Sequence, residues 1–346
     1  MHTPNPEIKG QRLAKGLYYD IGLQLMKLLN ILLIVAAFAG CWLLYYVNRV
    51  IMRPSPLRSA GVILLFTFLY SFFGRVYDIM HCNTPSGGMV GRICAHQMKT
   101  PKVIYMAHGF HFWKGAPLKN WLLYYPVERF LAHFTDRLIT INHEDYARAQ
   151  RFHFKKGGKA VYIPGVGIDP KKYAPDTEKR ANKRQELGIL DGETMLLSVG
   201  EVNQNKNHKV VIEALAKWQR KDIRYVICGI GPMEAELKKL VETLGLAAQV
   251  TFAGYRTDIG DYYQAADVFV ISSYREGLPV APMEAMTACI PCVASRIRGS
   301  VDLLADSSLL FDAGDSDISI ILWIHRLPVV THILQKKNLS CVGTIV

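Results

Sequence analysis

Cysteine is sparse in this 346-residue sequence, and the seven cysteines form no recognisable framework. Their number is odd and their spacing irregular, which argues against the disulfide scaffold of a small secreted protein. No group of Cys and His residues has the spacing of a zinc site. The one C-x-x-C stretch, "CIPC" at 289–292, follows a predicted helix and leads into a strand, whereas a redox pair would open a helix. The sequence therefore argues against thiol-redox and zinc chemistry.

Charge is missing from two long apolar stretches near the amino terminus. Residues 28–47 form a run of 20 without any charge, which is enough for a helix to cross a hydrocarbon core of about 30 Å. Trp42, Tyr45 and Tyr46 near its end suit the membrane interface. Residues 60–73 form a run of 14, which fits a short span, a re-entrant piece or a buried helix. No small-residue cleavage site precedes further apolar sequence, which argues against a cleaved signal peptide.

Acidic residues are also few in this part of the chain. Residues 1–92 hold nine Lys or Arg side chains against three acidic ones, which supplies half of the formal net charge of +12. Such a cationic segment suits the anionic cytoplasmic leaflet of a membrane. The sequence therefore predicts a membrane-anchor region at 1–75, with helices at about 24–48 and 58–74. A buried pair of hydrophobic helices is the alternative.

From residue 76 onward, short β-rich runs alternate with helical segments. The first predicted strands lie at 76–82, 102–108, 137–142 and 160–165. Residues 166–193 are charged, rich in Gly and Pro and poor in strand formers, which is typical of a linker between domains. The second series of predicted strands lies at 194–200, 223–229, 249–254, 268–273 and 292–295. Strict alternation of this kind predicts βαβ units and parallel sheets.

The predicted organisation is an α/β chain with two doubly wound domains. A partial first domain covers 76–165, a second covers 194–312, and residues 313–346 form an atypical tail without a clean helical period. Two such domains facing one another form a cleft, and ligands bind at the carboxyl ends of the strands.

The stretch "SSYREGLPVAPMEAM", at 272–286, predicts what this cleft binds. It joins the end of a buried strand to the start of a helix, and it carries Glu276 and Glu284. The free amides and the dipole of a first helical turn suit a pyrophosphate. Carboxylates repel phosphate but accept strong hydrogen bonds from the vicinal hydroxyls of a sugar. The combination predicts a nucleotide-sugar site.

These residues and others resemble a known family. "EGLPVAPMEAM" is similar to the E-x7-E element of the retaining GT-B glycosyltransferases of family 4. "HCNTPSGGMVGR" and "AHGFHFWKGAPLKNWLLYYPVER" resemble the first domain of the capsule and exopolysaccharide branch of this family. Further stretches similar to the family are "IPGVGID", "VGEVNQNKNHKVVIEAL", "CGIGPMEAELKKL" and "FAGYRTDIGDYYQAADVFV", the last of these to its base-binding region. Residues 1–75 resemble instead the membrane-spanning beginning of polyprenyl-phosphate sugar transferases. The resemblance implies two Rossmann-like domains, the first incomplete, after N-terminal membrane helices.

The resemblance also implies roles for individual residues. The catalytic residues would be His108, beside the anomeric carbon, and Glu276, facing the donor sugar. Donor-binding residues would be Asn203, Lys206, Gly254, Tyr255, Arg256, Gly277, Leu278, Val280 and Glu284. Acceptor-side residues would be Gly87, Gly88, His111 and Lys114, although the two glycines could instead permit close helix packing. Cys289 stands where a helix-ending glycine is expected, which predicts a left-handed backbone there at a cost of about 1 kcal/mol.

The implied function is transfer of a sugar from a nucleoside-diphosphate donor, with UDP as the expected nucleotide, to a lipid-linked saccharide with retention, in exopolysaccharide or capsule synthesis. No cofactor and no metal are required, and no Asp-x-Asp motif stands at the end of a predicted strand. The expected partners are the nucleotide sugar, the lipid-linked acceptor and the membrane, with no nucleic acid, and the catalytic part is expected to be cytoplasmic. The alternatives are a truncated or chimeric, inactive membrane protein that keeps the nucleotide-sugar domain, and a sugar-nucleotide epimerase.

Overall fold

The computed structural model describes residues 77–165, 167–304 and 310–314. The chain divides into two compact units, one of residues 1–80 and 90–101 and one of residues 81–89 and 102–346. The candidate site belongs entirely to the second unit. None of the helices in the described ranges is long and apolar enough to cross a bilayer. The predicted membrane helices at 24–48 and 58–74 lie outside the described residues, as does the tail from residue 315.

Four strands form the first sheet, in the order β1-β2-β3-β4. They are β1 (Ile79–Asn83), β2 (Lys102–Ala107), β3 (Arg137–Thr140) and β4 (Lys159–Tyr162). The pairs β2–β3 and β3–β4 are parallel, with Ala107 opposite Thr140 and Thr140 opposite Tyr162. The predicted strands are confirmed here, because short apolar runs between helical segments are typical of buried parallel strands. The carboxyl end of β2 leads directly to His108.

Helices connect the strands of this first sheet. They are α3 (Pro85–Gln97), α4 (Leu118–Leu131), the short 3-10 helix η1 (Ala132–Phe134) and α5 (His143–Ala149). The helix α4 continues through Pro126. The helix α5 begins where Asn142 accepts a hydrogen bond from the backbone N–H of Asp145, at 2.8 Å. This N-cap satisfies an amide that the first turn leaves without an intrahelical partner.

The second sheet has six strands in the order β10-β9-β8-β5-β6-β7. They are β5 (Thr194–Val199), β6 (Ile223–Cys228), β7 (Val250–Gly254), β8 (Val268–Ile271), β9 (Cys292–Ser295) and β10 (Leu310–Phe311). The pairs β5–β6, β6–β7, β5–β8, β8–β9 and β9–β10 are all parallel. The strand order reverses between β5 and β8, which creates a crevice at their carboxyl ends where such sheets bind ligands.

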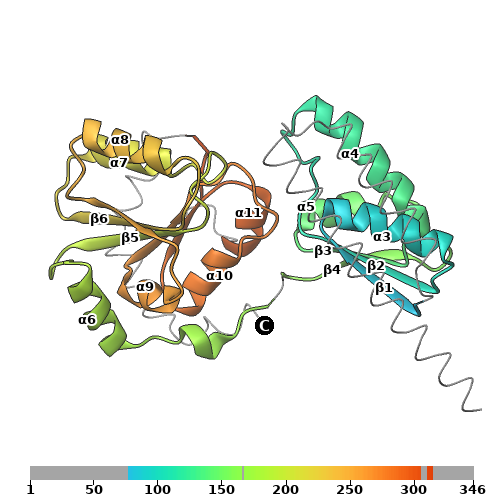
Figure 1. The fold of residues 1–346 in the computed structure, drawn as a ribbon, viewed down its shortest axis with the longest axis horizontal. Coiled ribbons are helices and arrows are strands. Elements are labelled where there is room, and N and C mark those ends of the chain that lie inside the picture. The colour runs from blue at the N-terminus through green and yellow to red at the C-terminus, as the bar shows by residue number, and fades with distance from the viewer. Residues whose placement is uncertain (1–76, 166, 305–309, 315–346) are drawn as a thin grey trace, which may run out of the picture. The chain divides into compact units, whose positions relative to one another are not determined.

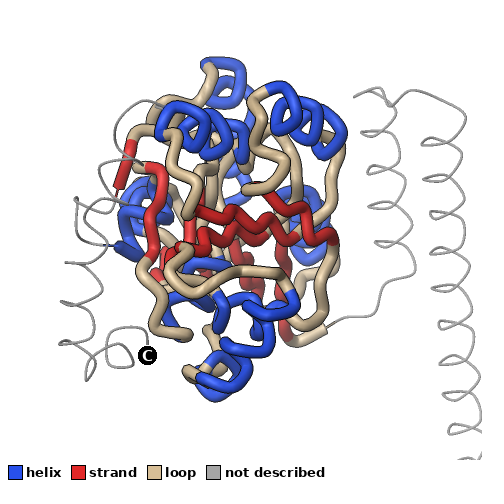
Figure 2. Tube along the Cα trace, turned by 90° about the vertical axis from the view of Figure 1, so that its left-hand side faces the viewer, coloured by secondary structure: helices blue, strands red, loops and turns tan. Residues whose placement is uncertain are grey.

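Helices cover both faces of this second sheet. They are α6 (Thr177–Glu186), α7 (His208–Trp218), α8 (Glu234–Thr243), α9 (Ile259–Ala265), α10 (Val280–Thr287) and α11 (Arg298–Leu304), preceded by the 3-10 helix η2 (Pro170–Tyr173). Figure 1 shows α7 and α8 on one side of the strands and α9 and α10 on the other. In Figure 2 helices, in blue, likewise lie on either side of the strands, in red.

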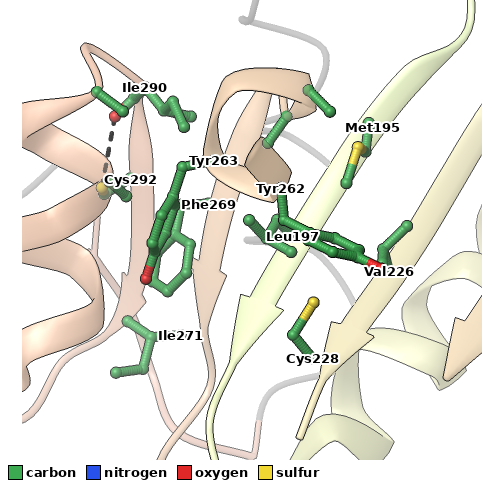
Figure 3. Close-up of a cluster of buried hydrophobic side chains, with 14 of the residues drawn as sticks. Met195, Leu197, Val226, Cys228, Tyr262, Tyr263, Phe269, Ile271, Ile290 and Cys292 are labelled. Carbon is green, nitrogen blue, oxygen red and sulfur yellow. Dashed lines mark hydrogen bonds between the residues drawn. The ribbon is translucent and has the colours of Figure 1, made fainter. Parts of the chain in front are cut away.

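Side chains of alternate strand residues pack in two separate hydrophobic cores, one on each face of the sheet. Leu196 of β5 packs in the core beneath α7 and α8, whereas its neighbours Met195 and Leu197 pack in the core with α9 and α10. Figure 3 shows the second core, where the rings of Tyr263 and Phe269 lie 5.8 Å apart. Successive strand residues point to opposite faces, so a strand buried on both sides is apolar along its whole length.

The segment predicted as a linker, 166–193, contains a helix, α6, that packs against α9. The helix α6 starts at Asp176, whose carboxylate accepts from the backbone N–H of Lys179 at 3.0 Å. Arg180 and Arg184 then hold the two carboxylate oxygens of Asp267, at 2.6 and 3.0 Å. The sequence did not indicate this helix, because charged residues that bind a distant carboxylate look like a solvated loop in the sequence.

The end of α10 confirms the conformation predicted for Cys289. This residue has a φ of 59°, in the left-handed region. Its backbone N–H donates to Met286 O, and the N–H of Ile290 donates to Ala285 O, both at 3.0 Å. These two bonds form a Schellman motif, in which glycine is the usual residue at the left-handed position. "CIPC" therefore ends a helix and enters β9, as the sequence predicted.

Candidate active site

The loop after β8 carries the stretch that the sequence singled out. Pro279 caps α10 with an extended backbone, so the turn at Gly277 comes just before the helix. An added Cβ on Gly277 would stand 1.7 Å from the carbonyl oxygen of His108, and one on Gly109 would stand 3.0 Å from the Cα of Gly277. Only glycine permits so close an approach of two backbones. The loops that carry His108 and Glu276 therefore cross in direct contact.

A pocket opens where these two loops meet. Its lining combines two histidines, two arginines and one carboxylate. The lining residues are His108, Gly109, Phe110, His111, Asn205, Arg275, Glu276, Gly277 and Arg298. Four of them are predicted site residues, whereas Asn205, Arg275 and Arg298 were not indicated by the sequence. Among the charged lining residues two arginines stand against one glutamate, which favours an anionic ligand.

Lys206 lies in the loop after β5, and its side chain contacts Glu276 in the loop after β8. The strand order reverses between these two strands. Its Nζ donates to Glu276 Oε1 at 2.9 Å, with the two side chains 21% and 17% exposed. The lysine side chain passes over Gly200, where a Cβ would stand 2.9 Å from Lys206 Cε. The Lys206 backbone N–H donates to Asn203 Oδ1 at 3.0 Å, which fixes the loop. Two predicted site residues thus form an ion pair at the edge of the pocket.

Glu284 is held by two tyrosines that the sequence did not indicate. The hydroxyl of Tyr173 donates to Glu284 Oε1 at 2.6 Å, and that of Tyr263 donates to Oε2 at 2.8 Å. Burial, together with the neighbouring carboxylate, raises the pKa of both phenols, so both remain donors. Each carboxylate oxygen keeps a second lone pair, so Glu284 can still accept from the vicinal hydroxyls of a ribose.

Three of the predicted donor-binding residues lie at the end of β7. Gly254 has a φ of 70°, and its carbonyl accepts from the backbone N–H of Gly229 at 2.7 Å. Tyr255 is 75% exposed. Arg256 donates from Nε and Nη2 to the two carboxylate oxygens of Asp258, both at 2.9 Å. The arginine side chain is thus already engaged with Asp258, which leaves the backbone of this segment and the exposed ring of Tyr255 for a donor ligand.

The first turn of α10 holds the remaining predicted donor residues. Leu278 is buried beside Met106, Ile141 and Met283, so only its backbone is available to a ligand. Val280 is 40% exposed at the first position of the helix.

The predicted acceptor-side residues have different surroundings. Gly88 permits close packing, because a Cβ there would stand 2.2 Å from the ring of Tyr105, while Gly87 is exposed. The Lys114 side chain is exposed, and its backbone N–H donates to Glu144 Oε1 at 2.6 Å.

The ring of each predicted histidine also contacts a residue outside the His108 loop. His108 Nε2 lies 3.3 Å from Asn83 Oδ1, at the end of β1. The ring of His111 packs on that of Tyr124, with centroids 4.7 Å apart. Burial, followed by the charges of Arg275 and Arg298, lowers the pKa of His111. A neutral His111 can accept as well as donate a hydrogen bond.

Two family descriptions match the chain. Residues 179–321 match "Glycosyl transferases group 1", and residues 67–142 match "Glycosyl transferase 4-like". The chain is 43% identical over 247 residues to EpsD of Bacillus subtilis (strain 168), which covers 69% of this chain and 65% of EpsD.

A second relative covers more of both sequences. The UDP-Gal:alpha-D-GlcNAc-diphosphoundecaprenol alpha-1,3-galactosyltransferase of Escherichia coli is 32% identical over 312 residues, which is 86% of this chain and 79% of that protein. Among solved structures, Anabaena HepE in complex with UDP matches with a TM-score of 0.66 at 20% identity, over 82% of this chain and 78% of that one. At that identity the structural match shows a shared fold.

Proposed function

The chain belongs to the group 1 glycosyltransferases, and we propose that it moves a sugar from a UDP-linked donor to a lipid-linked saccharide with retention. The observation that carries this proposal is the meeting of Lys206, Glu276 and the Gly277 turn with the His108 loop at one pocket. The E. coli relative is named for a UDP-galactose donor, and HepE was crystallised with UDP, which supports UDP as the nucleotide.

In the proposed reaction, the bond from the anomeric carbon to the diphosphate breaks and a bond to the acceptor oxygen forms. The acceptor proton leaves with the diphosphate. Backbone amides of Gly277, Leu278 and Val280 at the start of α10 would bind that diphosphate. Lys206 would leave its partner Glu276 to balance the negative charge that develops on the diphosphate. Stabilisation of such developing charge is usually the largest catalytic effect. Glu276 would then be free to accept hydroxyls of the sugar.

An exposed apolar surface on α4 supports a membrane-bound acceptor. Its exposed apolar side chains are Leu118, Leu122, Leu123, Val127 and Phe130. The single acidic residue of this helix, Glu128, is buried, whereas Lys119 and Arg129 are exposed. Apolar side chains with basic neighbours suit an anionic lipid surface. The E. coli relative is named for a diphosphoundecaprenol acceptor. We therefore place the catalytic part, as a proposal, on the cytoplasmic face of a membrane.

The α4 surface also connects to the pocket. Asn120 Nδ2 donates to the carbonyl oxygen of His111 at 2.9 Å, and His111 lines the pocket. A lipid lying against α4 would therefore bring its saccharide to this side of the site.

Two charge-introducing substitutions on α4 test this arrangement. We expect Leu122→Glu/Leu123→Glu to raise the KM for a lipid-linked acceptor in anionic vesicles by about tenfold or more, because burial of each leucine is worth roughly 1.5–3 kcal/mol. The KM for a water-soluble acceptor with a short chain should stay unchanged. Leu190→Glu, at an equally exposed leucine outside α4, is the matched control. Equal effects on both acceptors would contradict the proposed role of this surface.

The function itself is tested by binding and turnover on the full chain. Titration calorimetry with UDP and UDP-sugars measures donor binding, and UDP release with membrane acceptors measures transfer, with Glu276→Ala as the inactive control. Analysis of the product linkage by NMR determines retention. Binding without release would favour the inactive nucleotide-sugar protein, and conversion of the donor without transfer would favour the epimerase. Absence of any UDP binding at millimolar concentration would refute all three.

A further inference from the structure

Arg298 is a buried arginine whose three hydrogen bonds connect both loops of the pocket. It is the first residue of α11, and its side chain is 5% exposed. Its Nε donates to the carbonyl oxygen of Glu276 at 3.0 Å, on the loop after β8. Its Nη2 donates to the carbonyl oxygen of Phe110 at 2.9 Å, on the loop after β2. One planar guanidinium therefore fixes the backbone on both sides of the pocket at once.

The third bond of Arg298 reaches a carboxylate that holds the same loop. Arg298 Nη1 donates to Asp145 Oδ1 at 2.7 Å, and Asp145 is fully buried. Asp145 Oδ2 accepts from the backbone N–H of Phe110 at 2.9 Å and from Asn142 Nδ2 at 2.8 Å. The ion pair thus holds Phe110 by both its N–H and its carbonyl oxygen. This residue lies two positions after His108, so the path of the His108 loop is fixed as well.

The two loops pack so closely where they cross that one cannot move without displacing the other. Besides the contact of Gly109 with Gly277, a Cβ on Gly299 would stand 2.5 Å from the carbonyl oxygen of Gly277. Gly299 directly follows Arg298 in α11. Backbones packed this closely transmit a displacement instead of relaxing it.

Stability alone is a weak reason for this ion pair. Burial lowers the pKa of Arg298 and raises the pKa of Asp145, which reports the cost of removing both charges from water. Replacement of such a pair by neutral groups is often neutral or stabilising. The geometry of the pair, which makes three hydrogen bonds to the backbone of the two pocket loops, points to a role in placing those loops.

We propose that Arg298 is a positioning residue that sets the His108 loop against the Glu276–Gly277 turn, and so sets the spacing between the groups on either side of the reacting carbon. This inference rests on the proposed glycosyltransferase function. It predicts a loss of kcat with little loss of donor affinity, because the predicted nucleoside contacts at Glu284 and in the segment 254–256 do not involve Arg298. A misplacement of about 1 Å can cost about 100-fold in rate.

The test compares Arg298→Gln with the charge-neutral double variant Asp145→Asn/Arg298→Gln. We expect the single variant to lose about 100-fold in kcat for UDP release while the Kd for UDP stays within about threefold. The double variant removes the unpaired buried carboxylate, so it should recover thermal stability but not kcat. Arg296→Gln, which alters a partly exposed arginine two residues earlier that bonds Asp312, is the control and should keep wild-type kcat.

Recovery of kcat in the double variant would overturn the proposal, since it would show that the pair only supports folding. A parallel loss of kcat and UDP affinity would also overturn it. Hydrogen exchange of segments 108–112 and 274–279 gives a readout that needs no turnover. Faster exchange in both segments of the double variant supports the positioning role, and wild-type exchange there refutes it. A wild-type chain without UDP release would refute the proposed function, and the exchange result would still decide the role of Arg298.

Discussion

Replacement of Lys206 by alanine is expected to lower kcat for sugar transfer by about 10²- to 10³-fold. The diphosphate gains negative charge as the glycosidic bond breaks, and Lys206 Nζ is held at the edge of the pocket by Glu276 before the substrate arrives. As the bond breaks, Lys206 would move from Glu276 to the diphosphate, and this new ion pair stabilises the transition state. The KM for the donor should change only a few-fold, because the interaction strengthens only as charge develops. Steady-state UDP release measures both constants.

Lys209→Ala is the matched control for this prediction. Lys209 lies in the first turn of α7, three residues after Lys206, is exposed, and pairs with Glu213 at 3.6 Å along the helix. An exposed pair of this kind contributes little, so kcat should stay within about twofold. If Lys206→Ala kept kcat within a few-fold of the wild type, the pair with Glu276 would serve only to hold the loop.

The strands of both sheets could be predicted from the sequence because each is a short apolar run between helical segments. The run "TMLLSV" is buried on both faces as β5, and its alternate residues enter the two cores. The helix α6 could not be predicted in the same way. It is stabilised by Arg180 and Arg184 binding Asp267, more than 80 residues later, so its local sequence shows only charge. A local sequence pattern predicts helices and strands, but it does not reveal a residue far along the chain that stabilises them.

The same distinction applies to the candidate site. The turn "EGLPVAP" could be found because its amides, glycine and flanking acids follow one another in the chain. Tyr173 could not, because it reaches Glu284 across 111 residues. Arg298 and Asp145 are 153 residues apart and have no motif around them. Residues that position others are selected by three-dimensional geometry, so the structure is needed to identify them.

The second prediction with a large expected effect concerns the stability of the fold and rests on His208. Its Nδ1 lies 3.1 Å from the hydroxyl of Tyr225, which donates to Ser198 Oγ at 2.9 Å, and Ser198 donates to the carbonyl oxygen of Val270 at 2.6 Å. The hydroxyl protons of Tyr225 and Ser198 are both used in this series of hydrogen bonds. Nδ1 of His208 must therefore carry a proton and donate it to the Tyr225 hydroxyl. Burial, and then the charge of Lys206, lowers the pKa of His208 to about 4, against an opposing effect of the Glu201 backbone.

The wild-type protein should therefore lose stability as the pH falls from about 6.5 to about 4. In this window the unfolded chain binds a proton at His208 that the folded chain does not bind, so the free energy of unfolding decreases with falling pH. The full contribution is about 3 kcal/mol, at roughly 1.4 kcal/mol for each unit of pKa difference. His208→Asn, which can keep a donor near Nδ1, should remove this contribution. Urea denaturation of both proteins at pH 7.5, 6 and 5 measures the difference.

The difference between the two proteins isolates His208 from other groups that titrate in acid. Burial raises the pKa of Asp145 and of Asp302, and such carboxyls favour the folded state as the pH falls, which is the opposite sign. Their effect is common to both proteins and cancels in the comparison. His133→Asn, at an exposed histidine, should reproduce the wild-type slope. Parallel pH curves for the wild type and His208→Asn would contradict the prediction, because they would mean that His208 binds its proton equally well in the folded and the unfolded chain.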